Sequence, residues 1–513
     1  MKKRNKEFKL HPALLFLVLT FVIMIVSSIG GLLNIETSYY TVNSNTGNLE
    51  SKVVLINNLF NRTGLQNLVS NMLSNFINFA PLGNLIIGLL GVGVAYKSGY
   101  LVSLFKILSK KISRKTFTFL VVLFGIISSM FFPVGYVILI PIAAILFITL
   151  GRHPSAGICA AFAGITFGYG ANIVVNGLDS ALIDYTSSAS SILDSVYKVN
   201  INGNIYFMII STILLAYLGM IITERYVIPK LGRYNFTEEE TIEINKEVTI
   251  KEKKGVSIAL LTSLLIALIL IYTIIPGLPF SGLFLYLKDG LYVDQLFGDN
   301  SYFNQGVTVI FSALLIIAGL VYGFRVKTIR NNRDLVDGMS YYIKDVASIL
   351  VLIFFASQFC AIFKETNIGV FVVSSLTEII NSIEVSGLVL VILTFLITII
   401  CALFVPSAVT KWAIMSPIIV PMFMQSSMTP EFAQAVFRAG DSAVKGITPL
   451  FSYFVILIGF LQIYNKKKDV VSLTDTLGII LPYALIYSIL WFIIILAFYI
   501  IGLPVGVGTG VML

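Results

Sequence analysis

Charged side chains interrupt an otherwise apolar stretch near the C-terminus. Arg438, Asp441 and Lys445 are spaced three and then four residues apart, so a helix would carry all of them on one face. Gly446 and Pro449 follow and would break such a helix. In apolar surroundings, charges and broken backbone are costly and persist mainly where they line a polar cavity. The segment therefore predicts a site that binds a polar solute.

These charges have two interpretations at this level. Arg438 and Asp441 could form a structural ion pair between helices, or they could contact the solute. The three charges sum to one net positive charge, which is expensive to bury without compensation. A bound anion, or a proton cycling on Lys445, would remove the excess; alternatively, Lys445 extends to a polar interface. Asp441 and Lys445 are therefore candidate coupling residues.

Four further residues in or beside apolar segments are candidates for substrate contacts. Trp412 could stack on an aromatic ring, although tryptophan in such segments more often packs in the core or at an interface. Asn172 and Asn176 offer neutral hydrogen bonds to a solute or to a neighbouring helix. Asp179 ends its apolar segment, either as an interface residue or as the acidic group of a site.

The composition indicates a polytopic membrane protein. Of the 513 residues, 57% are hydrophobic and 12% are charged, whereas about a quarter of the residues are charged in typical soluble domains. Many apolar stretches approach the roughly 20 residues that a helix needs to cross a bilayer. We therefore expect an all-α, multi-pass protein in the lipid bilayer of the cell membrane.

The net charge of +9 does not indicate nucleic-acid binding, because the basic residues occur in short segments between apolar stretches. Such segments face the cytoplasm under the positive-inside rule, which predicts a cytoplasmic N-terminus. The basic segments contain Lys2, Lys3, Arg4, Lys6 and Lys9; Lys106, Lys110, Lys111, Arg114 and Lys115; Arg325, Lys327, Arg330 and Arg333; and Lys466, Lys467 and Lys468.

No motif points to an enzyme, a metal site or a cofactor. The sequence has only two histidines and lacks the HExxH, GxSxG and P-loop patterns. Cys159, Cys360 and Cys401 lie in apolar segments without paired spacing, as packing residues do. Without a site for ATP, transport driven by an ion gradient is the simplest function, and a channel is an alternative.

The chain divides into five predicted parts. The two membrane halves are each expected to contain a hairpin and a broken helix, and no separate soluble domain is expected. The parts are a first transmembrane helix at 1–33, an external loop at 34–80, the first membrane half at 81–235, a cytoplasmic loop at 236–255 and the second membrane half at 256–513.

The two membrane halves resemble each other when one is shifted by 276 positions, because Pro154 then meets Pro430 and Gly164 meets Gly440. The first copy includes the uncharged stretch 116–150, which is too long for one ordinary span. Gly- and Pro-interrupted segments at equivalent places in two halves indicate the binding site of a secondary transporter. We expect each copy to supply a re-entrant helical hairpin, and the two copies to be inverted as in that class.

Motifs across nearly the whole chain resemble the AbgT family, the p-aminobenzoyl-glutamate transporters. They include GRHPSAG at 151–157, GYGANIVVNGLD at 168–179 and PSAVTKWAIMSPIIVPMFMQSSMTPEFAQAVFRAGDSAVKGITPLFSY at 406–453. The resemblance implies a homodimer whose protomers have about nine transmembrane helices and two re-entrant hairpins. It implies ion-driven transport of p-aminobenzoyl-glutamate, a small aromatic organic anion, or efflux of sulfonamide-type antimetabolites. The positions that match the family's substrate pathway are Asp179, Trp412, Pro430, Arg438 and Asp441.

Other positions depart from the family's pattern and bear on the coupling ion. Ala402 stands where members usually have Asn, Val409 where they have Ser, and Lys445 where they have Asn. Tyr96 and Pro133 replace acidic residues. These changes remove oxygen ligands for sodium, and an ammonium group would repel that ion. The coupling ion is therefore expected to be a proton or sodium, with sodium disfavoured, and Lys445 to act as a built-in cation.

Overall fold

A computed structural model describes residues 10–42, 49–286, 290–298, 300–383, 385–466 and 470–513. The basic residues 2–9 of the predicted cytoplasmic N-terminus, and Lys467 and Lys468, lie outside these ranges. Within the described ranges, nine helical segments are long and apolar enough to cross a membrane, which agrees with the predicted all-α architecture. They are Pro12–Leu32, Arg62–Lys97, Arg114–Phe131, Ile205–Leu231, Ile250–Ile274, Tyr302–Val326, Asn332–Glu365, Gly387–Phe404 and Leu473–Ile501.

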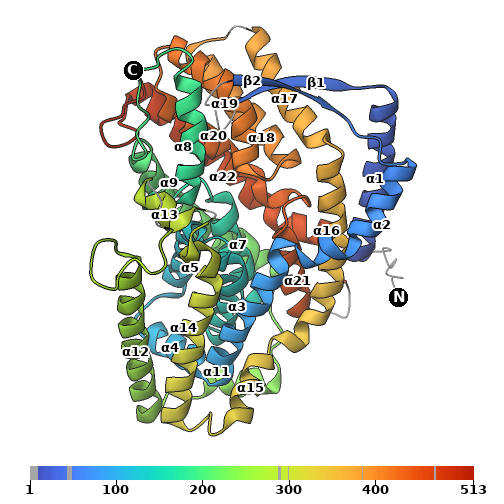
Figure 1. Cartoon of the computed structure of the whole chain (residues 1–513). Coiled ribbons are helices and arrows are strands. Elements are labelled where there is room, and N and C mark those ends of the chain that lie inside the picture. Colours follow the sequence, from blue (N-terminus) through green and yellow to red (C-terminus); the bar gives the residue numbers. More distant parts are fainter. Residues whose placement is uncertain (1–9, 43–48, 287–289, 299, 384, 467–469) are drawn as a thin grey trace.

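Helices make up most of both halves of the chain (Figure 1). The first half contains α1 (Pro12–Leu32), β1 (Glu36–Val42), β2 (Leu49–Leu55), α2 (Arg62–Ile77), α3 (Ala80–Lys97), α4 (Tyr100–Ser109), α5 (Arg114–Ser128), α6 (Ile140–Thr149), α7 (Pro154–Phe167), α8 (Gly177–Ser190), α9 (Ile205–Ile222) and α10 (Ile228–Leu231). π-Helical turns precede α6 at Gly135–Leu139 and α10 at Thr223–Val227.

The second half begins with a short polar helix and ends with the longest helix of the described chain. Its elements are α11 (Glu238–Asn245), α12 (Ile250–Ile274), α13 (Tyr292–Phe297), α14 (Tyr302–Val326), α15 (Asn332–Ser340), α16 (Ala347–Glu365), α17 (Ile368–Ile383), α18 (Gly387–Phe404), α19 (Ala408–Gln425), α20 (Pro430–Val444), α21 (Phe454–Ile463) and α22 (Leu473–Ile501). Short 3-10 turns occur at Ser129–Phe131, Ile343–Val346 and Lys445–Ile447.

Two helices, α7 and α20, lie in the interior, and every one of their residues is buried. Each has a proline in its first turn and a capping side chain, His153 or Thr429, that accepts a backbone N–H. α7 is rich in Ala and Gly, and such small side chains allow helices to pack closely in membranes. α20 instead carries charged residues into the interior, so this helix positions the candidate site.

The ends of several helices follow the offset found in the sequence. α5 and α18 end 276 positions apart, and so do α6 and α19. α7 and α20 begin with the same spacing. These coincidences agree with the predicted repeat. The repeat, its inversion and the re-entry of α6–α7 and α19–α20 into the membrane stay predictions.

The segment predicted as an external loop, 34–80, contains a β-hairpin and a helix. β1 and β2 pair antiparallel, with Glu36 opposite Leu55 and Val42 opposite Leu49. β1 reads ETSYYTV, whose β-branched and aromatic residues favour a strand. In Figure 1 the hairpin runs from α1 across one end of the molecule towards α17 and α19. The external position of this segment stays a prediction.

Two apolar segments of the sequence, 82–105 and 447–464, are long enough to suggest single spans but are not continuous helices. The span near 82–105 is divided into α3 and α4 at Gly99, whose φ of 87° is readily available only to glycine. The span near 447–464 is helical only over α21, because Gly446 and Pro449 lie in the segment that interrupts the helix before it.

Candidate substrate site

α20 places Arg438 opposite the start of α8. The Nη1 group of Arg438 donates to Oδ1 of Asp179 in an ion pair whose side chains are both buried. Asp179 lies in the first turn of α8, and its Oδ2 accepts the backbone N–H of Asn176 at 2.9 Å. Asn176 caps the same helix by accepting the N–H of Leu178. Asp179 is therefore fixed by a helix cap and joins a helix of the first half to one of the second.

The structural ion pair that the sequence suggested, between Arg438 and Asp441, is not the one that forms. Arg438 pairs with Asp179 on α8 instead. Asp441 forms ion pairs with two lysines. The Nζ atom of Lys411 lies 2.6 Å from Oδ1 of Asp441, and that of Lys445 lies 3.7 Å from Oδ2. The long lysine side chains explain the difference, because one reaches Asp441 from α19 and the other from the turn that ends α20.

Lys445 does not extend to a polar interface, so that alternative is wrong for this structure. The residue is 4% exposed, and its Nζ atom lies 3.6 Å from the centroid of the Tyr169 ring. Tyr169 belongs to the break between α7 and α8. A cation over an aromatic face is attracted by the ring's quadrupole. Lys445 therefore contacts the broken segments of both halves at once.

These five residues, Arg438, Lys411, Lys445, Asp179 and Asp441, form what we call the charge cluster. With all of them ionised, three cations face two carboxylates, and one net positive charge is buried. The Nε and Nη2 groups of Arg438 are buried and have no hydrogen-bond partner in the described part of the chain. These two groups form one edge of the guanidinium, which suits a carboxylate. The charge and the free donors are those of an anion site.

The break between α7 and α8 packs directly against α20. A side chain on Gly170 would place its Cβ atom 2.6 Å from the carbonyl oxygen of Arg438 and 2.7 Å from Oγ of Ser442. The backbone of the first half can approach that of the second this closely only because the position is glycine.

Gly170→Ala should therefore destabilise the protein by about 1–3 kcal/mol, the usual range for overpacking. Thermal unfolding of the purified protein in detergent measures the change. Gly83→Ala is the matched control, because a Cβ atom there meets nothing within 4 Å and Ala is the better helix former. Equal melting temperatures for the two variants would contradict the close approach.

Trp412, the residue after Lys411, is buried and packs against other side chains of the protein. Its side chain is 0% exposed, and its indole N–H donates to Oγ1 of Thr186 at 2.8 Å. The same hydroxyl lies 2.6 Å from Oε1 of Gln434. The Phe437 ring is 4.6 Å from the indole, centroid to centroid, with an angle of 33° between the planes. A substrate ring could reach Trp412 only after neighbouring helices part.

The other predicted site residues occupy different places. Asn172 is buried and donates to Oγ of Ser129 at 3.2 Å, so it bridges the α7–α8 break to the end of α5. Asn176 is part of the cap that holds Asp179. Pro430 starts α20, about 12 Å along the helix from Arg438 at 1.5 Å per residue. The structure therefore brings Asp179, Arg438 and Asp441 into one cluster and places Pro430 away from it.

The sequence reasoning missed Lys411 as a charge partner, and it missed Thr186 and Gln434 altogether. Lys411 gave a usable signal, since it is the single charged residue in the stretch 385–430 of the sequence and directly precedes Trp412. It also donates to the carbonyl oxygen of Val405, near the end of α18. Thr186 gave no comparable signal, because threonine is common in membrane helices and usually bonds to its own backbone.

The described ranges contain no candidate metal centre. No three side chains of His, Cys, Asp or Glu come close enough together there to hold a metal ion. The charge cluster itself contains only two acidic side chains, and each of them is paired with a cation.

Comparison with known proteins identifies the family. The family model of the AbgT transporters matches residues 7–513. The p-aminobenzoyl-glutamate transport protein of Escherichia coli K12 is 30% identical over 498 residues, which cover 97% of this chain and 94% of that protein.

Solved structures of two bacterial proteins are also similar. MtrF of Neisseria gonorrhoeae, described as illuminating a class of antimetabolite efflux pumps, is 33% identical with a TM-score of 0.50, over 98% of this chain and 97% of that one. The YdaH transporter of Alcanivorax borkumensis is 29% identical with a TM-score of 0.49, over 97% of this chain and all of the other. The family match over nearly the full length, together with the membrane helices, shows that this multi-pass membrane protein belongs to the AbgT family of transporters.

Proposed function

We propose that this protein transports an aromatic organic anion, with p-aminobenzoyl-glutamate as the first candidate. The name of the Escherichia coli relative supports this choice of substrate. So does the chemistry of the charge cluster, which has a net positive charge beside the aromatic pair of Trp412 and Phe437.

The free edge of Arg438 is the observation that carries the proposal. One nitrogen of the guanidinium is used by Asp179, while Nε and Nη2 are buried donors without a partner in the described chain. A buried donor without an acceptor costs about 1–3 kcal/mol. A substrate carboxylate would accept both N–H groups side by side and would cancel the excess charge. Arg438 thus binds a carboxylate, and Phe437 and Trp412 offer apolar surface for the ring.

The cluster is closed in this structure, so substrate reaches it only by a conformational change. Its members are at most 5% exposed. A path that opens to one side at a time fits a secondary transporter better than a channel, which needs a continuous pore. We assign the chain to a homodimer with a cytoplasmic N-terminus, as the resemblance and the basic segments imply.

Coupling is proposed to use a proton at the charge cluster. The ammonium group of Lys445 sits against Asp441 and over Tyr169, in a place that could otherwise hold a monovalent cation. Lys411 occupies the other oxygen of Asp441. With both oxygens taken by lysines, little room for sodium remains, and loss of a proton from Lys445 would leave the cluster neutral without substrate.

Uptake of radiolabelled p-aminobenzoyl-glutamate into proteoliposomes tests the function. An imposed proton gradient should raise the initial rate about ten-fold over no gradient, and a sodium gradient of the same size should leave it unchanged. Saturable uptake distinguishes a transporter from a channel. Uptake that needs sodium would refute the coupling proposal, and absence of any saturable uptake under either gradient would refute the substrate.

A second candidate is efflux of sulfonamide-type antimetabolites, because MtrF is 33% identical over nearly the whole chain. Inside-out membrane vesicles that contain the protein should then accumulate a radiolabelled sulfonamide, and an excess of p-aminobenzoyl-glutamate should compete. Accumulation of the sulfonamide without uptake of p-aminobenzoyl-glutamate would favour efflux as the function.

A further inference from the structure

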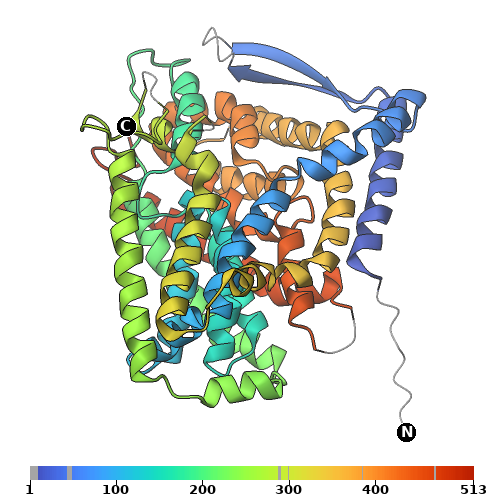
Figure 2. The same cartoon turned by 60° about the horizontal axis from the view of Figure 1, so that its bottom comes forward.

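A polar connection between the two halves crosses the end of the molecule opposite the β-hairpin, where it forms the yellow-green segment along the bottom of Figure 2. We call residues 232–249 the strap; it joins α10 to α12 and contains α11. Thr237 caps α11 in a capping box with Glu240, so the strap has a defined structure of its own.

One contact, which we call the Lys106 clamp, holds the C-terminal end of α11. The Nζ group of Lys106, on α4, donates to the carbonyl oxygens of Glu243 and Lys246, the latter at 2.8 Å. A cation suits this position, because the unpaired carbonyl groups make the C-terminus of a helix negative.

A second contact, which we call the Lys466 clamp, holds the N-terminal end of α11. Glu240 forms an ion pair with Lys466, which lies just after α21, at 2.6 Å. The same ammonium group lies 4.4 Å from the centroid of the Tyr234 ring, and that ring packs against His153 in the turn between α6 and α7, 5.1 Å away. The strap is thus fastened to parts of the chain that lie more than two hundred residues apart.

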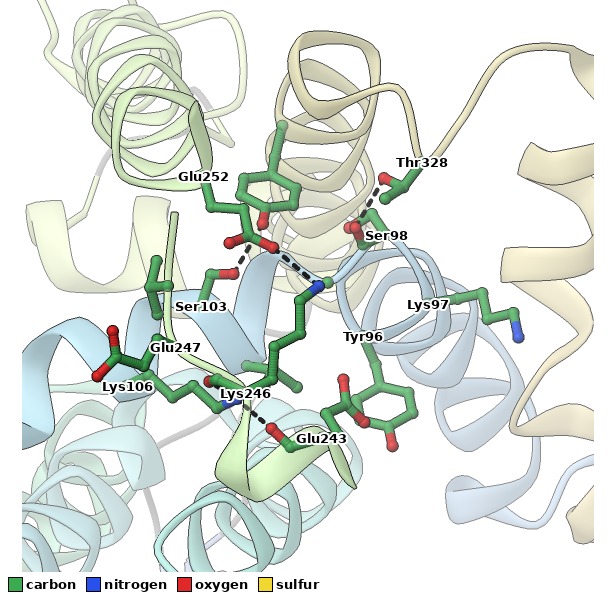
Figure 3. A pocket seen from close by; sticks show the side chains of 14 residues that line it. Tyr96, Lys97, Ser98, Ser103, Lys106, Glu243, Lys246, Glu247, Glu252 and Thr328 are labelled. Atoms are coloured by element: carbon green, nitrogen blue, oxygen red, sulfur yellow. Dashed lines mark hydrogen bonds and ion pairs between the residues drawn. The ribbon is translucent and has the colours of Figure 1, made fainter. Parts of the chain in front are cut away.

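The strap contacts α6 and also borders open space. A cavity of 190 Å³ lies between the strap and the ends of α3, α4 and α14, with Glu243 and Lys246 contributed by the strap and Lys106 by α4 (Figure 3). Tyr322 and Ser103, which share a hydrogen bond of 2.7 Å, line the opposite wall. Thr149 at the end of α6 and Ile244 of α11 both line a second, much smaller pocket.

The contact between Glu240 and Lys466 is a weak one. Glu240 and Lys466 are 20% and 31% exposed, and ion pairs of this kind contribute about 0–1 kcal/mol. About half of the residues of α11 are exposed, whereas every residue of α7 is buried. Elements with few buried contacts open at the lowest free energy in a structure.

We propose that the strap is a latch: it must release from Lys466 for the covered side of the α6–α7 turn, where Tyr234 packs on His153, to become accessible during transport. Lys106 keeps the strap attached to α4 while the Lys466 clamp opens. The latch concerns the transport cycle, so it does not depend on which substrate is carried.

A reversible tether tests the latch. Glu240→Cys and Lys466→Cys are combined and joined with a short bifunctional methanethiosulfonate reagent, which a reducing agent removes. The tether should lower the initial rate of p-aminobenzoyl-glutamate uptake into proteoliposomes about ten-fold, as expected when a required opening is blocked. Reduction should restore the rate.

Labelling gives a readout that needs no substrate. Thr149→Lys, added to the pair, should react with a water-soluble succinimidyl ester about ten-fold more slowly when the tether is closed. This ester modifies amines and not the tethered thiols, and mass spectrometry of the peptide that contains the new lysine measures the rate. This arm separates failure of the latch from failure of the proposed substrate. The latch is overturned if the closed tether leaves either rate unchanged.

The control pair is Lys246→Cys with Glu252→Cys. These residues also form an ion pair, at 3.3 Å, but both lie at the junction of the strap with α12 and do not fasten it to α21. The same tether there should change uptake and labelling less than two-fold, a difference of about 0.4 kcal/mol. The parent chain treated with the reagent controls for its own cysteines, two of which are buried.

Discussion

Arg438→Ala is expected to reduce uptake of p-aminobenzoyl-glutamate at least about 100-fold, because two charge-assisted hydrogen bonds to a carboxylate are together worth about 3 kcal/mol or more. The substitution also leaves Asp179 buried without its cation, which typically costs about 3–5 kcal/mol of stability. Uptake is measured in proteoliposomes at equal protein incorporation, and thermal unfolding is measured beside it.

A double variant separates binding from folding. In Arg438→Met with Asp179→Asn, both charges of the pair are removed, and the new amide can still accept the backbone N–H of Asn176. Its stability should therefore lie closer to that of the parent than Arg438→Ala does. Uptake should nevertheless stay lost, because the free guanidinium edge is gone. Parental uptake in the double variant would show that Arg438 serves only as a structural partner of Asp179.

Lys445→Asn is expected to raise the KM for the anion about ten-fold, because the charge cluster then carries no net charge and attracts a carboxylate less strongly. The same change frees one oxygen of Asp441 and adds an amide oxygen, which are ligands that sodium accepts. Uptake by the variant should therefore increase with sodium, whereas uptake by the parent should not. Initial rates over a range of substrate concentrations, with and without sodium, measure both effects.

Lys327→Asn is the matched control for that experiment. Lys327 is exposed and has a φ of 70°, a conformation that asparagine tolerates. The substitution removes one positive charge from the protein and leaves the charge cluster unchanged. The KM of this variant should therefore match that of the parent. A parental KM and no sodium response in Lys445→Asn would refute a role for Lys445 in binding and coupling.

Local patterns were enough to predict much of the architecture. Apolar length predicted a multi-pass helical protein, and the offset of 276 positions between Pro154 and Pro430 is also the offset between the starts of α7 and α20. The β-hairpin was missed, although the Thr, Tyr and Val residues of β1 carried a strand signal. A polar segment between two membrane spans resembles an irregular loop in composition, and composition outweighed the local pattern.

The pairing within the charge cluster could not be predicted from one sequence. The spacing of Arg438 and Asp441 correctly placed both on one helix, α20, whereas Lys445 lies in the 3-10 turn that follows this helix. Asp179 is 259 residues away from Arg438 in the chain, and only tertiary packing brings α8 to α20. Local spacing therefore suggested the neighbour Asp441 as the partner, whereas the fold supplied a better-placed carboxylate.

The ion pair between Asp179 and Arg438 joins the two halves, and this has a consequence for leakage. Any motion that parts α8 from α20 in an empty carrier must separate opposite charges away from water, at a cost of several kcal/mol. A substrate carboxylate on the free edge of Arg438 would keep the guanidinium compensated while Asp179 departs. Return of the unloaded carrier would then be the slow step, and exchange of substrate across the membrane would run faster than net flux.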